Sequence, residues 1–360
     1  MKIVVIQKKR IGDVLTSTIL LEALKAQFPD AKLHYLIYEN SLAVVQNNPF
    51  VDKIVILNEK TRKGLKQFIA FLFEIRKEHY DVVVDAYGKP NSVLIGWFSG
   101  AKKRITFDKV YSRLLYTDAM VRKEAIHLEA TTAIEHRMLL LEPLNIPFQI
   151  IVPKIFLLAN EIDAAKKRLS DAGIDLSKKM VMISALGSSD SKTYPLEQMA
   201  KVLDQIAEEE NTVLLLNYLP WQKDQAQELY RFCNPATQAK IAFDFYENDL
   251  REFLATTALC NALIGNEGGA TNMAKALQIP TFTIFCPGVP KIGWNLSENE
   301  TTNISVHSDD YGIEGETVEA KYNLFTPDLF HGRLQHFLNH NLKENVINLI
   351  QIRYPKIKRL

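Results

Sequence analysis

The feature that most constrains the fold is residues 262–285, where two apolar segments flank a glycine-rich turn and a helix. Residues 262–264 are apolar, the turn Gly265-Asn266-Glu267-Gly268-Gly269 follows, a helix rich in Ala, Met and Leu comes next, and residues 282–285 are apolar again. Two strands joined in this way form a parallel βαβ unit. The turn directs unpaired N–H groups and the positive end of the helix dipole above the sheet edge, where a phosphate can bind.

The residues of this turn predict a binding site for a ligand. Gly268 and Gly269 allow a close approach to the backbone, and the Glu267 carboxylate can accept hydrogen bonds from ribose or sugar hydroxyls. The alternative interpretation is an ordinary helix cap with two turn glycines.

Apolar segments alternate with helical patterns in two arrays, which predicts an α/β chain with two doubly wound parallel sheets. In the first array we expect strands at residues 2–7, 32–38, 53–57, 82–86 and 103–107. In the second array we expect strands at residues 180–184, 213–217, 241–244, 262–264 and 282–285. At 360 residues the chain exceeds the usual size of a single core. We expect domains at residues 1–154 and 155–327, and a helical segment at 328–360 that packs back on the N-terminal domain.

A second polar turn, Lys8-Lys9-Arg10-Ile11-Gly12-Asp13, follows the first expected strand and precedes a helix at residues 14–28. Ligands of open α/β sheets bind at this edge, so three cations, a glycine and an acid predict a site for an anionic ligand. The turn lacks both the dinucleotide pattern G-x-G-x-x-G and the Walker pattern. The other interpretation of Asp13 is a helix cap.

A third polar turn, residues 185–195, connects the expected strand 180–184 to a helix at residues 196–209. Its hydroxyls, including that of Ser188, and its N–H groups can donate hydrogen bonds to a diphosphate, and Lys192 supplies the counter-charge. By itself such a loop is typical of a solvated turn. Three polar turns at equivalent strand ends together indicate a binding function.

The net charge is only +1, but its distribution along the chain is uneven. Residues 1–154 contain 23 Lys/Arg and 16 Asp/Glu, residues 155–327 contain 14 and 24, and residues 328–360 contain 6 and 2. A basic first half favours an anionic partner on the N-terminal side, with Lys8, Lys9, Arg10 and Gly12 as candidate residues that bind it. No RNA-binding aromatic motif or zinc finger is present, so we expect no nucleic-acid partner.

Several compartments and cofactors are disfavoured by composition. No apolar run approaches the roughly 20 residues of a membrane span, and the chain opens on a strand rather than a signal peptide, which predicts a cytoplasmic protein. The three cysteines lack metal-ligand spacing, so we expect no metal, cofactor or disulfide. An apolar stripe with a cationic border predicts core packing first and peripheral docking on a membrane second. The stripe consists of Phe68, Phe71, Leu72 and Ile75.

Short segments in a particular order give the chain a family resemblance. They are residues 11–14, 48–55, 80–85 and 100–107, His136 before residues 144–147, and residues 192–195 and 265–280. In this order and spacing they resemble glycosyltransferase family 9, the ADP-heptose:lipopolysaccharide heptosyltransferases.

The resemblance implies a GT-B fold, in which two Rossmann-like domains face a central cleft, with the acceptor on the first and the nucleotide-sugar on the second. It also implies an inverting transfer without a metal. Asp13 matches the general base that deprotonates the acceptor hydroxyl. Lys192 matches the residue that neutralises the leaving diphosphate, and Ser188 matches a neighbouring hydroxyl donor. Asp224 lies where the family contacts ribose or base, or it caps a helix.

The chain departs from the family pattern at the donor turn. The family usually has N-D-[ST]-G and a His three residues later, whereas this chain has Asn266-Glu267-Gly268-Gly269 and then Asn272. These departures fall on the donor-sugar side, where a site that matches one sugar's hydroxyls discriminates against others.

We therefore expect a cytoplasmic glycosyltransferase, peripheral to the inner membrane, that moves a sugar from a nucleotide-diphosphate donor to an anionic lipid-linked glycan. The resemblance implies heptose from ADP-heptose and a lipopolysaccharide core as acceptor. Two alternatives stay open. One is a nucleotide-sugar epimerase or hydrolase of the same fold, and the other is a non-catalytic protein that binds a nucleotide-sugar or glycan.

Overall fold

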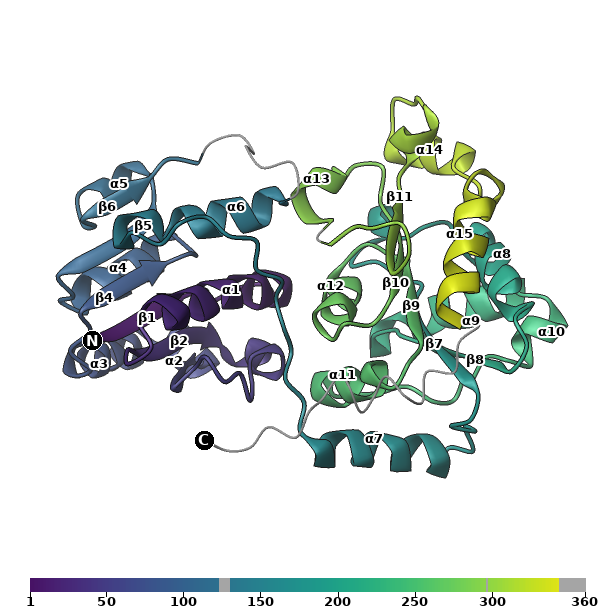
Figure 1. The fold of residues 1–360 in the computed structure, drawn as a ribbon, viewed down its shortest axis with the longest axis horizontal. Coiled ribbons are helices and arrows are strands. Elements are labelled where there is room, and N and C mark those ends of the chain that lie inside the picture. Colours follow the sequence, from purple (N-terminus) through teal and green to yellow (C-terminus); the bar gives the residue numbers. More distant parts are fainter. Residues whose placement is uncertain (123–129, 296, 343–360) are drawn as a thin grey trace. The chain divides into compact units, whose positions relative to one another are not determined.

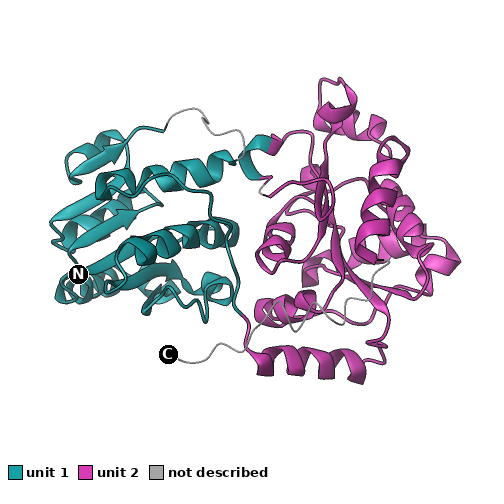
Figure 2. Cartoon of the chain, in the orientation of Figure 1, with its two compact units in different colours: residues 1–156, 292–294 teal, residues 157–291, 295–360 magenta. Residues whose placement is uncertain are grey.

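The chain divides into two compact units (Figure 2). The computed structural model describes residues 1–122, 130–295 and 297–342. Unit 1 comprises Met1–Phe156 and Ile292–Trp294, and unit 2 comprises Leu157–Lys291 and the chain from Asn295 onward. The sequence placed the first boundary after residue 154, close to the observed end of the main segment of unit 1.

Unit 1 is built on a six-stranded parallel sheet with the order β3-β2-β1-β4-β5-β6 (Figure 1). The strands are β1 (Lys2–Ile6), β2 (Lys32–Tyr38), β3 (Lys53–Leu57), β4 (Val82–Asp85), β5 (Lys103–Phe107) and β6 (Asp118–Met120). The helices are α1 (Ile11–Gln27), α2 (Glu59–Lys63), α3 (Leu65–Lys77), α4 (Pro90–Phe98), α5 (Val110–Arg113) and α6 (Thr132–Leu139). The strand order reverses between β1 and β4, and such a switch point is where open α/β sheets bind ligands.

The helices of unit 1 cover both faces of its sheet. Right-handed crossovers place α1 on one face, where α6 packs against it, and α3, α4 and α5 on the other (Figure 1). Because both faces are covered, β1 is buried from Ile3 to Ile6 and contains a continuous apolar run rather than an alternating one.

Unit 2 contains a five-stranded parallel sheet with the order β11-β10-β9-β7-β8 (Figure 1). The strands are β7 (Lys179–Ser184), β8 (Thr212–Leu216), β9 (Ala262–Asn266), β10 (Thr281–Ile284) and β11 (Asn303–Val306). Its helices are α7 (Ala159–Asp171), α8 (Leu196–Ala207), α9 (Lys223–Phe232), α10 (Pro235–Gln238), α11 (Leu250–Ala258), α12 (Gly269–Ala276), α14 (Val318–Leu324) and α15 (Pro327–Leu342). The short helix α13 (Lys291–Trp294) begins at the last residue of this stretch of unit 2, and its other three residues belong to unit 1. Here the order reverses between β7 and β9.

The prediction of two doubly wound parallel sheets is confirmed, with three differences in the strands. The expected strand 241–244 is wrong, because only a single bridge from Ile241 to Leu214 forms and Phe243 leaves the sheet to stack on Tyr218. The sequence also missed β6 and β11. Both are short edge strands with a polar first residue, so they lack the apolar run that marked the others.

The C-terminal segment differs from expectation. Helix α15 packs on α8 and buries Phe330, Leu334 and Phe337 in the core of unit 2, where Phe282 meets two of these rings (Figure 1). We expected residues 328–360 to pack on the N-terminal domain, which is wrong for the part up to residue 342, because its apolar face completes the unit 2 core. Residues 343–360 lie outside the described residues. Within the described ranges, no helix is long and apolar enough to cross a membrane.

The core of unit 1 contains a buried pair of charged side chains. Lys8 is fully buried at the end of β1, with its Nζ 5.8 Å from the Tyr38 ring centre and 5.3 Å from that of Tyr87. Its ammonium has no hydrogen-bond partner among the described residues. Burial lowers the pKa of Lys8 to about 8, against the opposing effect of Asp85. Burial also raises the pKa of Asp85 to about 6.

A close backbone contact joins β9 to β7 in unit 2. Gly265 has a φ of +143°, and a Cβ at this position would lie 2.1 Å from the carbonyl oxygen of Ser184. Only glycine accepts both the backbone conformation and the contact. The contact brings the turns that follow β7 and β9 together.

The contact at Gly265 predicts a large loss of stability in Gly265→Ala. The methyl group must displace the β7 backbone, so we expect the free energy of unfolding to fall by about 3 kcal/mol or more. Urea unfolding followed by circular dichroism measures the change. Gly332→Ala in α15 is the control, since a Cβ there meets nothing within 4 Å; it should be neutral or stabilising by roughly 0.5–1 kcal/mol. Equal midpoints for wild type and Gly265→Ala would contradict the close contact.

The burial of Lys8 predicts a pH-dependent stability. Its folded pKa is lowered to about 8, so above this pH the folded chain has released a proton that the unfolded chain still holds. The free energy of unfolding of the wild type should therefore rise relative to Lys8→Met from pH 8 through the ordinary lysine range, by on the order of 3 kcal/mol. Urea titrations at several pH values measure this difference. Lys9→Met, at an exposed neighbour, should follow the wild type, and the same profile in Lys8→Met would show that Lys8 keeps its proton.

Candidate functional site

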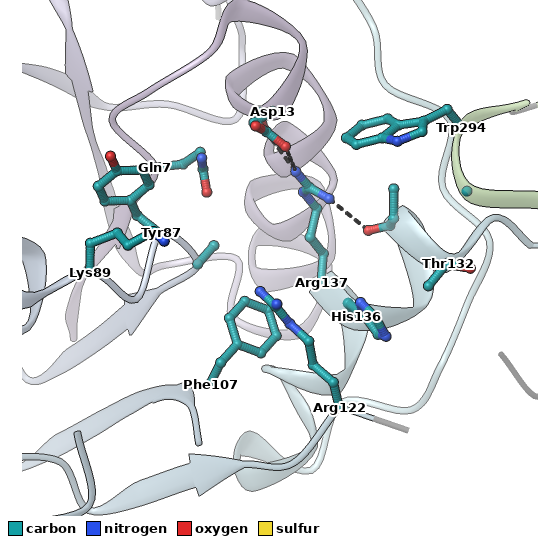
Figure 3. Close-up of a pocket in the computed structure, with 13 residues that line it drawn as sticks. Gln7, Asp13, Tyr87, Lys89, Phe107, Arg122, Thr132, His136, Arg137 and Trp294 are labelled. Atoms are coloured by element: carbon teal, nitrogen blue, oxygen red, sulfur yellow. Dashed lines mark hydrogen bonds and ion pairs between the residues drawn. The ribbon is translucent and has the colours of Figure 1, made fainter. Parts of the chain in front are cut away.

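Unit 1 contains a pocket of about 340 Å³ at its switch point, where β1 and β4 end (Figure 3). Its walls come from the turns after β1 and β4, the end of β5, helix α6 and the segment Ile292–Trp294. The lining residues are Gln7, Asp13, Ala86, Tyr87, Lys89, Phe107, Arg122, Thr132, Ala133, His136, Arg137, Gly293 and Trp294.

Asp13 lies in the first turn of α1, and Arg137 of α6 holds it in place (Figure 3). Arg137 Nη2 donates to Asp13 Oδ1 at 2.9 Å, its Nε donates to Ser17 Oγ at 2.8 Å, and its Nη1 donates to the Ala133 carbonyl at 2.8 Å. These bonds fix the guanidinium of the buried Arg137 on three sides. The second carboxylate oxygen of Asp13, Oδ2, has no hydrogen-bond partner among the described residues and is available to a ligand.

Two further cations line the pocket that contains the Asp13 carboxylate. The Arg122 guanidinium lies 4.0 Å from the centre of the Phe107 ring, and Lys89 contributes an exposed ammonium. Burial lowers the pKa of Arg122 and of Arg137, and Asp13 opposes this shift in both. Both arginines stay charged at neutral pH because the ordinary arginine pKa lies above 12. The pocket therefore suits an anionic ligand that brings a hydroxyl to Asp13.

The basic turn divides into three kinds of residue. Lys9 and Arg10 are exposed, as an acceptor-binding role requires. Lys8 is not, and its prediction as an acceptor-binding surface cation is wrong, because its side chain follows Ile6 into the core. Gly12 precedes Asp13, and a Cβ there would meet nothing within 4 Å.

In unit 2, the side chain of Asn266 connects the turn after β9 to the turn after β7. Its Oδ1 accepts from the Tyr194 N–H at 2.8 Å, and its Nδ2 donates to the carbonyls of Ser184 and Ala185. Asn266 is buried, and these contacts use both amide N–H groups and one of the two acceptor positions of Oδ1. The structure thus assigns Asn266 a positioning role, in place of the predicted direct contact with the donor.

Glu267 and Lys192 come from the two turns that Asn266 connects. Burial raises the pKa of Glu267, while Lys192 and Lys275 lower it, so both ammonium groups act on this carboxylate. Lys192 is exposed, whereas Lys275 of α12 is buried, donates to Asn295 Oδ1 at 3.1 Å, and has its pKa lowered by burial to about 8. The turn after β9 thus contains one carboxylate on which two cations act.

The remaining predicted donor residues lie on the same sheet edge. Ser188 is exposed in the turn after β7. Asp224 is exposed in the first turn of α9, and the neighbouring Gln222 anchors that segment by donating to the Gly187 carbonyl at 2.9 Å. Trp221 beside it is 77% exposed.

Helix α12 begins at the glycines of the donor turn. Gly268 precedes its first residue, Gly269, and a Cβ on Gly268 would meet nothing within 4 Å. Asn272 is half-buried one turn further on. The turns after β7, β8 and β9 thus gather the predicted donor residues at the switch point of unit 2.

Sequence reasoning missed several residues of both sites. Arg137 lies 124 positions from Asp13, and Lys275 occupies an apolar helical pattern, so neither belongs to a local motif. The basic character of the first half was the available signal for Arg122 and Lys89. Among the residues described, no three His, Cys, Asp or Glu side chains are grouped as metal ligands.

Comparison with known proteins connects this geometry to a family. The sequence model of glycosyltransferase family 9 (heptosyltransferase) matches residues 69–321. The chain is 25% identical to lipopolysaccharide heptosyltransferase 1 of Campylobacter coli over 301 residues, which cover 79% of this chain and 84% of that protein.

Solved structures share the fold. A family 9 glycosyltransferase from Veillonella parvula has a TM-score of 0.74 at 18% identity, covering 93% of this chain and 97% of that one. The ADP-heptose lipopolysaccharide heptosyltransferase II of Escherichia coli has a TM-score of 0.71 at 17% identity, covering 94% and 99%. The two parallel-sheet units are thus the domains of a GT-B fold, and the chain belongs to glycosyltransferase family 9, the heptosyltransferase family.

Proposed function

We propose that this glycosyltransferase moves a heptose from ADP-heptose to an anionic glycan acceptor of the lipopolysaccharide core, at the cytoplasmic face of the inner membrane. The observation that carries the proposal is the Asp13 carboxylate, held by Arg137 in a cationic pocket at the switch point of unit 1. The relatives named for lipopolysaccharide heptosyl transfer support the sugar and the acceptor class.

Unit 1 binds the acceptor in this proposal. Arg122 and Lys89 pair with its anionic groups, and the exposed Lys9 and Arg10 attract it from solution. Asp13 Oδ2 accepts the proton of the acceptor hydroxyl as the hydroxyl oxygen attacks the anomeric carbon of the donor. Arg137 keeps the carboxylate oriented toward the pocket and is a positioning residue.

Unit 2 binds the nucleotide diphosphate. As the new glycosidic bond forms, the bond from the anomeric carbon to the diphosphate oxygen breaks. The configuration at the anomeric carbon is inverted. Lys192 and the Ser188 hydroxyl stabilise the negative charge that develops on the diphosphate, without a metal ion. Glu267 accepts hydrogen bonds from donor hydroxyls, and Asp224 contacts the ribose.

The donor is tested by titrating the purified protein with ADP-, UDP- and GDP-sugars and following product with and without acceptor. Tight binding of the ADP-sugar and transfer that requires the acceptor support the proposal. Release of free sugar or nucleotide without acceptor would identify the epimerase or hydrolase alternative. Binding without turnover under any condition would identify the non-catalytic alternative.

The proposed base predicts that Asp13→Asn lowers turnover by about two to four orders of magnitude, because an amide cannot accept the acceptor proton. Donor affinity should stay unchanged, since the donor binds to unit 2. Steady-state kinetics and isothermal titration with ADP measure the two quantities. Asp30→Asn, at an exposed acid just past α1, is the matched control. Normal turnover in Asp13→Asn would remove this residue from the mechanism.

The proposed division of binding predicts that charge removal acts separately in the two units. Lys192→Ala should weaken ADP binding about tenfold or more, because a charged hydrogen bond to the diphosphate is lost, while Lys201→Ala, at an exposed lysine of α8, should not. The double variant Lys9→Ala/Arg10→Ala should raise the acceptor KM and flatten its salt dependence. Loss of ADP binding in the double variant, with normal binding in Lys192→Ala, would reverse the assignment of the units.

A further inference from the structure

Helix α3 presents a row of apolar side chains to solvent. Leu65, Ile69 and Phe73 recur every four residues, which places them on one face of the helix, and their exposed fractions are 75%, 44% and 55%. The opposite face packs Phe71 and Ile75 into the unit 1 core. The stripe that the sequence singled out is therefore mostly core, and the exposed row is a second stripe on the same helix.

The neighbouring helices also carry exposed apolar side chains. Helices α3, α4 and α5 cover the same face of the unit 1 sheet (Figure 1). Phe73 meets Phe98 of α4 edge to face at 5.3 Å, and Trp97 beside it is exposed. Val110 of α5 and Leu114, directly after α5, are more than 80% exposed. Large apolar side chains gathered on one face mark an interaction surface.

Basic residues border this surface. Residues 59–77 contain six Lys/Arg and two Asp/Glu, and residues 102–113 contain five and one. Within the described chain, Lys60, Lys66 and Lys77 have no ion-pair partner and are exposed. Helix α4, which lies in the sequence between these two basic segments, has no charged side chain. A neutral apolar centre with a cationic border is complementary to an anionic lipid surface, where headgroups meet the cations and apolar side chains enter the interface.

The surface begins at the rim of the acceptor pocket. Lys89, which lines the pocket, directly precedes α4, and Phe107 lies three residues before α5. We propose that the outer face of α3, α4 and α5, defined by Leu65, Ile69, Phe73, Trp97, Val110 and Leu114, docks on an anionic membrane. Its place beside the pocket presents a membrane-anchored acceptor to Asp13. Docking itself needs neither donor nor acceptor, so its test is independent of the proposed transfer reaction.

The experiment is co-sedimentation of the full chain with vesicles of phosphatidylglycerol and phosphatidylcholine in equal parts, and with vesicles of phosphatidylcholine alone. The wild type should bind the anionic vesicles and release them at high salt. Leu65→Glu/Ile69→Glu should lower the affinity for anionic vesicles by about tenfold or more, because two apolar insertions are lost and two negative charges face the headgroups. Lys60→Gln/Lys66→Gln/Lys77→Gln should bind more weakly and lose most of the salt dependence.

Matched controls separate docking from folding. Leu324→Glu/Leu329→Glu replaces leucines of 59% and 44% exposure in unit 2 and should bind as the wild type does. Val110→Glu/Leu114→Glu provides a second test on α5, should α3 tolerate its change poorly. Thermal unfolding of each variant should match the wild type because the altered side chains are exposed. Absence of wild-type binding, or equal binding by all apolar variants, would overturn the proposal. Self-association of the wild type that Leu65→Glu/Ile69→Glu abolishes, without vesicle binding, would assign the surface to a second copy of the chain instead.

Discussion

The common direction of the strands is the constraint on which both candidate sites depend. In a parallel sheet every crossover returns the chain to the same edge, so turns far apart in sequence end together at the strands' carboxyl ends. In unit 1 this brings Asp13, after β1, and Lys89, after β4, to the same pocket. In unit 2 it brings Lys192, after β7, to the Glu267 carboxylate, after β9. The switch in strand order opens the space between each pair of turns.

Polar residues near the two sites fall into two groups: buried side chains that are hydrogen-bonded within the protein, and exposed side chains that can bind a ligand. Asn266 is buried and makes three hydrogen bonds to the end of β7 and the turn after it, and Arg137 is buried and bonded on three sides. Such side chains hold the site in shape before any ligand arrives, which lowers the entropy cost of binding. Ser188 and Lys192, by contrast, are exposed in the turn after β7, where a ligand can reach them.

Each unit also buries a lysine behind its site. Lys8 and Lys275 are both buried, and burial lowers the pKa of each to about 8. A desolvated ammonium costs stability, which Asp85 offsets in part for Lys8, and Glu298 and Glu267 offset in part for Lys275. In unit 2 this charge acts directly on Glu267, where the chain departs from the usual family motif, so the unusual carboxylate and the buried cation belong to one electrostatic arrangement.

The sequence by itself determined the two parallel sheets and most of their strands, because apolar runs and polar turns are local signals. It also identified the turns that contain Asp13, Lys192 and Glu267, because glycines and charged residues directly after an apolar run are local features of the sequence. Only the tertiary structure decided that Arg137 holds Asp13, that Asn266 is a bridge and that Lys8 is buried. It also separated the core face of α3 from its exposed face. These outcomes depend on partners up to 124 positions away, because the packing of distant elements, rather than the local pattern, sets which polar group is covered and what it contacts.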